Sequence, residues 1–398
     1  MIRALKKIPY PKAIAVSYGA MFVEGSLTTI MVGLMSVLAL KFGKTNGDIA
    51  TLLSFKSFGT LSVLFFSGKF SDKYGRKLPI LSGSLLFMVF ILGFIFTDNY
   101  LLASLFAFAG GVAHGLMDTP GMSLLFDAFS GNTGPAMSLV QVFFASGGVM
   151  TTLLSSLFIR NQWDYRLIFL LILVVNTALF ILALKAKFPP LSGKVEMKTE
   201  RTPFKRKPTF LREGFLLLLN TLIYSSFHAV ISTWLPTYVL ELKGFLLADS
   251  VVTLSIYQTG AISGSLFFAV LLRKLHSTVL IAINPLLCTI TMVGLLILKP
   301  SFLILVCIFI MGFLMGSFFS LNINMGGELF YDRAGSATGA IASASMMGST
   351  IIIWASGQLI SKVGVSNLFL FSFSLLIILS VLTNLFRIHY KKLLAKGG

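Results

Sequence analysis

The chain has 398 residues, of which 56% are hydrophobic and only 12% are charged. Soluble domains carry about 25% charged residues, so this composition excludes a soluble globular protein and indicates a chain that crosses a membrane many times. A formal net charge of +18 would suggest a nucleic-acid partner in a soluble chain. Here the basic residues gather in short links between apolar stretches, and we expect no nucleic-acid partner.

Twelve apolar stretches follow one another along the chain. Each has about 20 residues or more, enough to cross a hydrocarbon core of ~30 Å as a helix that rises 1.5 Å per residue. A helix satisfies its own backbone hydrogen bonds in lipid, so we expect an all-α membrane protein with twelve transmembrane helices. The predicted spans are residues 13–40, 48–68, 78–97, 100–126, 135–159, 166–186, 213–240, 249–272, 278–298, 301–327, 335–360 and 365–386.

Basic residues set the predicted orientation. Of the 32 Lys and Arg, 24 fall in segments on the side of the N-terminus and 7 on the other side, while Lys56 alone lies within a predicted helix. The positive-inside rule therefore predicts a multi-pass protein of the cell membrane with both termini in the cytoplasm. Residues 187–212, rich in Lys, Arg and Pro, indicate a cytoplasmic linker that rests on anionic lipid. The linker would separate an N-terminal six-helix bundle, 1–186, from a C-terminal one, 213–398.

The link after the second predicted helix has the pattern G-x-x-x-D-x-x-G-R-K, formed by Gly68, Asp72, Gly75, Arg76 and Lys77. An acid, two glycines and a basic cluster in so short a link predict a tight aqueous turn; an ordinary basic loop is the alternative. The pattern resembles the signature of the major facilitator superfamily of transporters. The resemblance implies close helix approach at the glycines, an acid that caps a helix N-terminus, and basic residues that hold a cytoplasmic gate.

The two halves of the chain repeat each other at an offset of 201 residues. At this offset Gly111 coincides with Gly312 and Gly147 with Gly348, and the acid Asp127 coincides with Glu328. A parallel repeat of six helices predicts the two-bundle transporter plan, major facilitator fold, with a solute site near the membrane midplane. Asp72 coincides with Arg273, so the second half lacks the acid of the signature.

Four ionisable residues fall inside predicted helices. Glu24 lies ~16 Å into the first helix, near the midplane, and Lys56 lies at a similar depth in the second. His114 and Asp118 share one face of the fourth helix because they are four residues apart. A charge at this depth costs about 2.5–3.5 kcal/mol and indicates function, so we predict that these four residues couple transport to protons. A static Glu24–Lys56 ion pair, and an Asp118 bonded to water or to a neighbouring helix, are the alternatives.

Two further acids lie at the predicted cytoplasmic ends of helices. We expect Asp127 to form an ion pair with Arg76, and Glu328 to pair with Arg273 or Lys274 in the second half. The resemblance implies that these pairs close the inner gate. A solvated acid at a helix end is the alternative in each case.

Polar residues within the predicted helices are candidates for solute binding, although each could instead bond to a neighbouring helix. Trp234, in the sequence Trp-Leu-Pro-Thr-Tyr near the outer end of the seventh helix, is predicted to be an interfacial anchor. The solute-binding candidates are Gln141, Asn220, His228, Gln258, Asn322 and Asn324.

Several of these features are similar to the fucose-permease-like group of proton symporters: Glu24, Asp118 by position, the Trp234 sequence and Phe188-Pro189-Pro190. The resemblance implies uptake of a sugar or related small polar solute with protons, by alternating access. Lys56 departs from that group. A proton-coupled drug or solute efflux antiporter is the alternative, although the fifth predicted helix lacks the internal proline usual in antiporters. A sodium gradient is a second open alternative.

The sequence contains no phosphate-binding loop and no metal-ligand spacing. We therefore expect no enzyme activity, no cofactor and no metal. The expected partners are a small-molecule substrate, protons and membrane lipid, and the expected state is a monomer.

Overall fold

The protein is described here by a computed structural model that covers residues 10–129, 134–190, 204, 206–272, 274–330 and 334–394. The chain divides into two compact units, Met1–Val195 and Glu196–Gly398. This division falls within the predicted linker 187–212. Residues 191–203 and 205 lie outside the described part, so the linker and its contact with lipid stay predictions.

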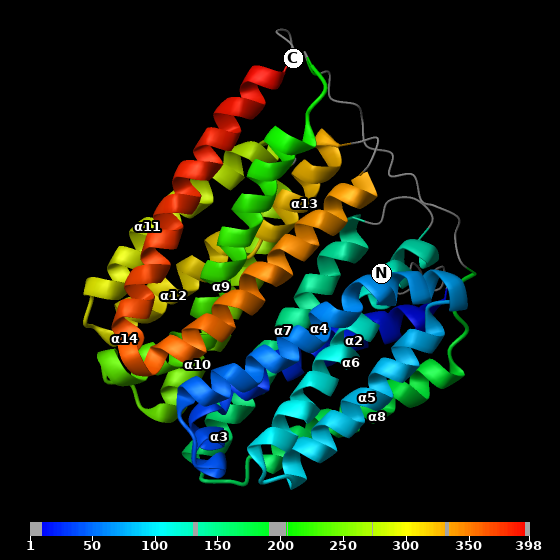
Figure 1. Ribbon diagram of the computed structural model, residues 1–398, viewed down its shortest axis with the longest axis vertical. Helices are drawn as coiled ribbons and strands as arrows, with labels where there is room; N and C mark the ends of the chain where they lie inside the picture. The colour runs from blue at the N-terminus through cyan, green and yellow to red at the C-terminus, as the bar shows by residue number, and fades with distance from the viewer. Residues whose placement is uncertain are drawn as a thin grey trace. The chain divides into compact units, whose positions relative to one another are not determined.

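Helices make up almost all of both units (Figure 1). The helices of the first unit are α2 Pro11–Gly33, α3 Met35–Phe42, α4 Asn46–Tyr74, α5 Lys77–Phe96, α6 Tyr100–Ala128, α7 Gly134–Arg160 and α8 Arg166–Lys185. The second unit begins with one π-helical turn, η1 Phe210–Gly214. Its other helices are α9 Phe215–Lys243, α10 Leu247–Leu271, α11 Ser277–Ile297, α12 Ser301–Met315, α13 Phe318–Leu329 and α14 Ala334–Leu393.

The helices account for the twelve predicted spans. Among the described residues, ten helices are long and apolar enough to cross a membrane, and α4 is an eleventh if its bent halves count as one span. The sixty-residue α14 is two helices joined at Gly364, whose φ of 75° is left-handed. Figure 1 shows its two arms, orange and red, meeting at this kink. Dividing α14 there gives twelve spans.

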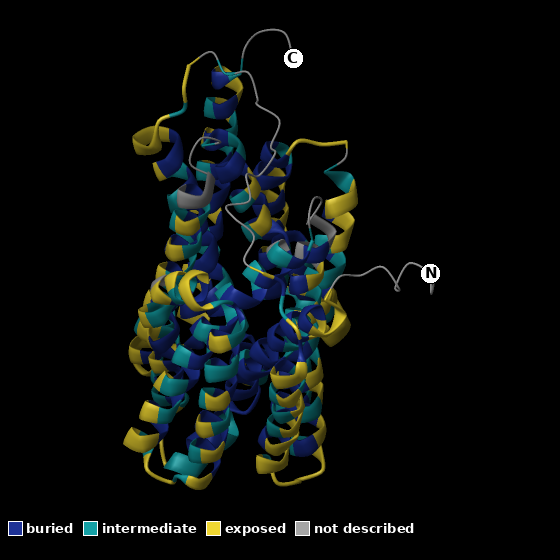
Figure 2. Cartoon of the chain, turned by 90° about the vertical axis from the view of Figure 1, so that its right-hand side faces the viewer, coloured by how far each residue is buried: buried dark blue, intermediate teal, exposed yellow. Residues whose placement is uncertain are grey.

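In both units many helices bury one side and expose apolar residues on the other, whereas α2 and α9 are buried nearly all round. Figure 2 shows the exposed residues along the outer surfaces of the helices, and many of these are large and apolar, such as Leu105 and Val174 at 65% and 67% exposure. A soluble protein does not leave so many large apolar side chains in water. Lipid is the solvent that suits this surface.

The predicted repeat is visible in the hydrogen bonds of the two units. Ser26 Oγ donates to the Gly147 carbonyl at 3.2 Å, and Ser226 Oγ donates to the Gly348 carbonyl at the same distance. A second repeated feature lies at the helix ends. Lys41 Nζ donates to the carbonyls of Phe94 and Ile95 at the end of α5. Lys243 Nζ does the same for the carbonyls of Leu296 and Leu298 at the end of α11.

The repeated glycines let helix backbones touch. A Cβ atom at Gly111 on α6 would lie under 3.0 Å from the Lys56 carbonyl on α4, and one at Gly312 on α12 would lie as close to the Tyr257 carbonyl on α10. The obstructing atoms are backbone and cannot rotate away. Gly111 therefore allows α4 to pack directly against α6 at Lys56, and Gly312 does the same for α10 and α12 at Tyr257.

Replacing Gly111 with alanine is expected to lower stability by about 1–3 kcal/mol, because the added methyl group forces α4 and α6 apart. The midpoint of thermal unfolding in detergent should fall by several degrees. Gly339→Ala on α14 is the matched control, since a Cβ there would have no heavy atom within 4 Å. Equal midpoints for the two variants would contradict the close-packing role of Gly111.

Two predictions about the helices were wrong in detail. The second span was expected to end near residue 68, but α4 continues to Tyr74, so Gly68 and Asp72 are helical and the turn is only Gly75 and Arg76. Trp234 was predicted at the membrane interface. It is fully buried instead, and its indole Nε1 donates to Ser356 Oγ of α14 at 2.9 Å.

Candidate functional site: a buried ionisable cluster

Glu24 lies on α2, inside the first unit, with no exposed surface. Within the described part of the chain, neither of its carboxylate oxygens has a hydrogen-bond partner. Its nearest described ionic neighbour is His114 on α6, whose Nε2 lies 3.8 Å from Glu24 Oε2. A buried carboxylate without hydrogen bonds is energetically expensive, so this position is unlike a structural core residue.

His114 and Asp118 occupy successive turns of α6, as predicted, and both face Glu24. One ligand atom from each of the three residues lies within 4.8 Å of the other two. The Nδ1 atom of His114 is also buried without a hydrogen-bond partner. The three side chains can therefore share a proton, and the same three groups could hold a bare cation.

Lys56 on α4 completes the group, which we call the ionisable cluster: Glu24, Lys56, His114 and Asp118. The Lys56 side chain is 6% exposed, and its Nζ donates to Thr28 Oγ1 on α2 at 3.1 Å. Among the residues that the structure describes, no direct ion pair joins Lys56 to Glu24. Their charges are nevertheless close enough to interact. The static Glu24–Lys56 pair, which was the alternative to a proton-coupling role, is therefore not formed, and Lys56 bonds instead to Thr28, one turn after Glu24 on α2.

The ionisable cluster contains two acids and one ammonium group, so with a neutral His114 it has one negative charge in excess. In a low-dielectric interior an excess charge is costly, and the cluster favours the uptake of one positive charge. A proton is the smallest cation that can supply this positive charge.

A second ionic group lies where α4 meets α5. Arg76 Nε donates to Asp127 Oδ2 at the end of α6 at 2.7 Å, which is the predicted ion pair. Arg76 Nη1 also donates to Ser71 Oγ at 2.9 Å and to Asp72 Oδ1 at 2.5 Å. The Arg76 and Asp127 side chains are 9% and 2% exposed, whereas that of Asp72 is 72% exposed. We call Asp72, Arg76 and Asp127 the arginine cluster.

The backbone and electrostatics of this turn explain the signature residues. Gly75 has φ 87°, in the left-handed region that favours glycine, and it reverses the chain between α4 and α5. Burial acts to lower the pKa of Arg76, but the hydrogen bonds and charges of Asp127 and Asp72 outweigh burial and raise it. Arg76 is therefore held in its charged form.

Three roles implied by the signature differ from the structure. Asp72 caps no helix N-terminus, because it lies in the last turn of α4, and α5 has Arg76 at its N-cap without a side-chain cap. Lys77 lies apart from the arginine cluster. Its Nζ donates to the carbonyls of Leu184 and Ala186 and so caps the end of α8. The close helix approach expected at Gly68 also differs, since a Cβ atom added there would make only ordinary contact with the Thr119 side chain of α6.

The equivalent region of the second unit brings a histidine and a tyrosine to Glu328, and the predicted pairing of Glu328 with Arg273 stays a prediction. Arg273 lies outside the described residues. Glu328 on α13 lies 3.2 Å from His276 Nε2 and accepts a hydrogen bond from the Tyr390 hydroxyl of α14. Tyr390 and His276 were absent from the sequence prediction, because a histidine and a tyrosine carry no fixed charge that would mark them as partners of an acid.

The predicted solute-binding residues fall into two groups. Asn220 on α9 is fully buried, and both polar atoms of its amide lack partners. Gln258 Oε1 on α10 and Asn322 Oδ1 on α13 are likewise buried without partners. By contrast, Gln141 is exposed on α7, and Asn324 donates to Ser277 Oγ, away from these amides.

His228 belongs to an aromatic cluster in the second unit, formed with Tyr224, Tyr257 and Phe318. Its ring centroid lies 5.8 Å from those of Tyr224 and Tyr257, and Phe318 stacks on Tyr224 at 4.8 Å. The Tyr257 hydroxyl is buried without a partner. Asn220 is one turn before Tyr224 on α9, and Asn322 is one turn after Phe318 on the antiparallel α13. Both amides therefore lie on the same side of the stacked pair.

The tyrosines were missed, but the repeat contained a signal for them. At the offset of 201 residues, Lys56 coincides with Tyr257, and at 200 residues Glu24 coincides with Tyr224 and Thr28 with His228. The two units thus hold an ionisable cluster and an aromatic cluster at equivalent positions.

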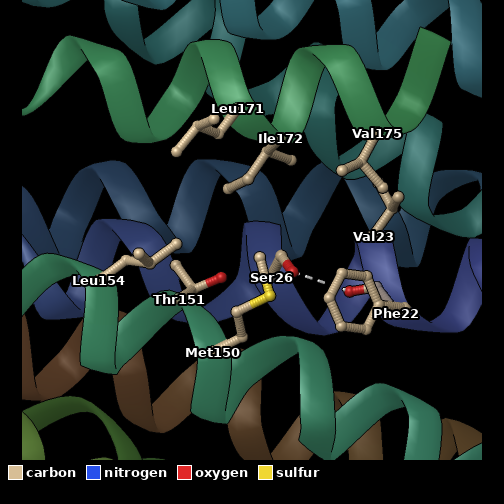
Figure 3. Close-up of a pocket in the computed structure, with 9 residues that line it drawn as sticks. All are labelled: Phe22, Val23, Ser26, Met150, Thr151, Leu154, Leu171, Ile172 and Val175. Carbon is tan, nitrogen blue, oxygen red and sulfur yellow. Dashed lines mark hydrogen bonds between the residues drawn. The ribbon is translucent and has the colours of Figure 1, made fainter. Parts of the chain in front are cut away.

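A small pocket between α2, α7 and α8 is not a solute site. Figure 3 shows it lined mainly by apolar side chains, and its volume of about 10 Å³ is enough for one water molecule. Its two hydroxyls, Ser26 and Thr151, already donate to backbone carbonyls. Nothing polar remains free in its wall to orient a solute.

Comparison with known proteins identifies the family. The family model described as Major Facilitator Superfamily matches residues 17–352. The chain is similar to the uncharacterized MFS-type transporter YfkL of Bacillus subtilis (strain 168), with 28% identity over 94% of this chain and 95% of that protein. It is 29% identical to the inner membrane transport protein YdiN of Escherichia coli (strain K12), over 94% and 90% of the two chains.

A solved structure agrees in fold. The crystal structure of a D-xylose-proton symporter superposes with a TM-score of 0.77 and 15% identity, covering 97% of this chain and 98% of that one. The twelve helices, the signature turn and the match over most of the chain lead to one conclusion: this multi-pass membrane protein belongs to the Major Facilitator Superfamily of transporters.

Proposed function

We propose that the protein is a secondary active transporter that takes up a small polar solute, a sugar or a related compound, together with protons by alternating access. The observation that carries this proposal is the burial of Glu24 without a hydrogen-bond partner, beside His114 and Asp118. The excess negative charge of the ionisable cluster is removed when one proton binds. Protonation therefore changes the stability of any conformation that keeps the cluster away from water.

Solute binding is assigned to the buried amides and the aromatic cluster of the second unit. Each unsatisfied buried amide or hydroxyl costs about 1–3 kcal/mol unless a partner arrives. Asn220, Gln258, Asn322 and Tyr257 would recover this free energy when they bind the hydroxyl groups of a solute. His228 and Tyr224 would offer ring faces to the solute body.

The arginine cluster is assigned to gating. In this proposal Arg76, Asp72 and Asp127 stabilise the state that is closed on the cytoplasmic side, and Glu328 with its partners does the same in the second unit. The protein would work as a monomer in the cell membrane, with both termini in the cytoplasm and without a cofactor.

The test is uptake into proteoliposomes with an imposed pH gradient, using sugars, nucleosides, organic acids and cationic dyes. Accumulation of a polar solute that collapses when the gradient is dissipated would support proton-coupled uptake. Accumulation driven only by a sodium gradient would overturn the proton assignment. Outward movement of cationic dyes alone would establish the efflux antiporter in its place.

A further inference from the structure

Lys56 is the member of the ionisable cluster that proton coupling leaves unexplained. Carboxylates and a histidine suffice to carry a proton, and a lysine within a membrane span is costly in itself. Its side chain is 6% exposed, so the ammonium group gains little from solvent. A further role is needed to account for a positive charge at this position.

The hydrogen bonds of Lys56 are incomplete. An ammonium group has three N–H donors, and Lys56 uses one of them, to Thr28 Oγ1 at 3.1 Å. The Thr28 hydroxyl donates its own hydrogen to the Glu24 backbone carbonyl, so Thr28 acts on Lys56 purely as an acceptor. Among the described residues the Lys56 ammonium group has no other hydrogen-bond partner, and two donors remain for a ligand.

Lys41 shows what a structural lysine looks like in this protein. Its ammonium group donates to two backbone carbonyls, at 3.2 Å each, at the end of α5. Lys243 has the equivalent bonds in the second unit. Both side chains cap a helix C-terminus, where a positive charge is favourable. Lys56 caps no helix end, so its charge serves something other than the fold.

Glu24 does not take the free donors of Lys56. Its two oxygens are without hydrogen bonds although the opposite charges are close enough to interact. A lysine that served only to neutralise Glu24 would contact it directly, since the attraction between two buried charges offsets their desolvation only at close, hydrogen-bonded geometry. The arrangement leaves the ammonium group available to a second anion.

We infer that Lys56 binds the carboxylate of the transported solute, which makes that solute a small organic acid, such as a sugar acid or hydroxy acid, in place of a neutral sugar. This inference rests on the proposed function, whose solute class it narrows. The carboxylate would accept the two remaining N–H groups of Lys56 in charge-assisted hydrogen bonds.

The charges around Lys56 tie the binding of an acid to protons. Lys56 faces Glu24 and Thr28 on α2, and His114 and Asp118 lie opposite on α6. A bound carboxylate would raise the excess negative charge of the cluster, which a proton on Glu24, His114 or Asp118 would offset. Binding of the acid should therefore tighten as the pH falls, while the binding of a neutral solute need not.

The test measures ligand-induced thermal stabilisation and equilibrium binding on the purified full-length protein. The probes are pairs that differ in one carboxylate: gluconate against glucose, and benzoate against benzyl alcohol. We expect at least one acid to bind wild type while its neutral partner does not, with affinity that rises between pH 8 and pH 6. Lys56→Gln should weaken acid binding by about 10- to 150-fold, the value of a charged hydrogen bond.

The controls separate a binding role from a folding role. Lys56→Arg keeps the charge and should retain part of the affinity, whereas Lys41→Gln should leave affinity unchanged. Should Lys56→Gln fail to fold, Lys56→Arg and the pH dependence of wild type still decide the matter. Equal binding of the acid and its neutral partner, or no acid binding at all, would overturn the inference.

The failure of the inference and that of the proposed function are distinguishable. Proton-driven uptake of a neutral sugar, unaffected by Lys56→Gln, would overturn the inference and leave the proposed function intact. If acid binding requires Lys56 but uptake does not depend on the pH gradient, the inference would be supported and proton coupling would be overturned.

Discussion

Replacing Glu24 with glutamine is expected to reduce pH-gradient-driven accumulation to the level of protein-free liposomes. Glutamine has the shape of glutamate but cannot release or bind the proton, so the ionisable cluster would lose the group at its centre. Exchange of solute across the membrane without a gradient should continue, because it needs no net movement of protons. The measurement is initial uptake with an imposed gradient, beside counterflow without one.

The same variant should be at least as stable as wild type. Glu24 is a buried carboxylate whose oxygens have no hydrogen bonds, and a neutral amide of the same size removes the cost of burying its charge. Lost accumulation with an unchanged or raised unfolding midpoint would identify a functional group, because a structural defect lowers both.

The matched control is Glu241→Gln, which removes a carboxylate from the exposed last turn of α9 and should leave uptake unchanged. Asp118→Asn is the companion test within the ionisable cluster. Full gradient-driven accumulation by both Glu24→Gln and Asp118→Asn would contradict proton coupling through this cluster.

Much of the fold follows from the sequence because lipid imposes a simple rule on the chain. Each apolar stretch long enough to cross the membrane must be a helix, and the stretches correspond to the helices of the structure. Helix ends were less predictable. α4 extends to Tyr74 because a helix need not end where the apolar side chains end, and polar residues continue it into water.

The arginine cluster was predictable, and the ionisable cluster was predictable only in part. Arg76 and Asp127 are opposite charges at the same end of neighbouring helices, so few other pairings were open to them. The four ionisable residues were found because charge is rare inside the membrane. Their contacts were not, because the rotation of each helix about its axis decides whether Lys56 reaches Glu24 or Thr28.

The amide side chains also show that helix rotation, which the sequence does not reveal, decides which residues make contact. Asn322 and Asn324 are two residues apart and so point to nearly opposite sides of α13. The first is fully buried with a free acceptor, and the second donates to Ser277. Trp234 is a related case: its partner Ser356 is 122 residues away, and nothing near the tryptophan in sequence distinguishes burial from a membrane-interface position.

Replacing Arg76 with alanine is expected to have the largest effect on stability. The Arg76–Asp127 pair is nearly fully buried, and removal of one partner of such a pair costs about 3–5 kcal/mol, because the other charge loses its counterion. The exposed Asp72 contributes little to this loss. If the arginine cluster is the cytoplasmic gate, uptake should also fall while equilibrium binding of solute is largely retained.

A double-mutant cycle separates these effects. Asp127→Asn in the Arg76→Ala background removes the uncompensated charge and should restore part of the stability, while uptake stays low because the closed gate has lost its ion pair. Lys73→Ala is the control, since it removes a positive charge from the exposed last turn of α4, close in sequence to Arg76. Loss of solute binding by a well-folded Arg76→Ala protein would argue against a gate. A residue that stabilises one conformation of the transporter should change the rate of transport, and should leave the solute-binding site largely unchanged.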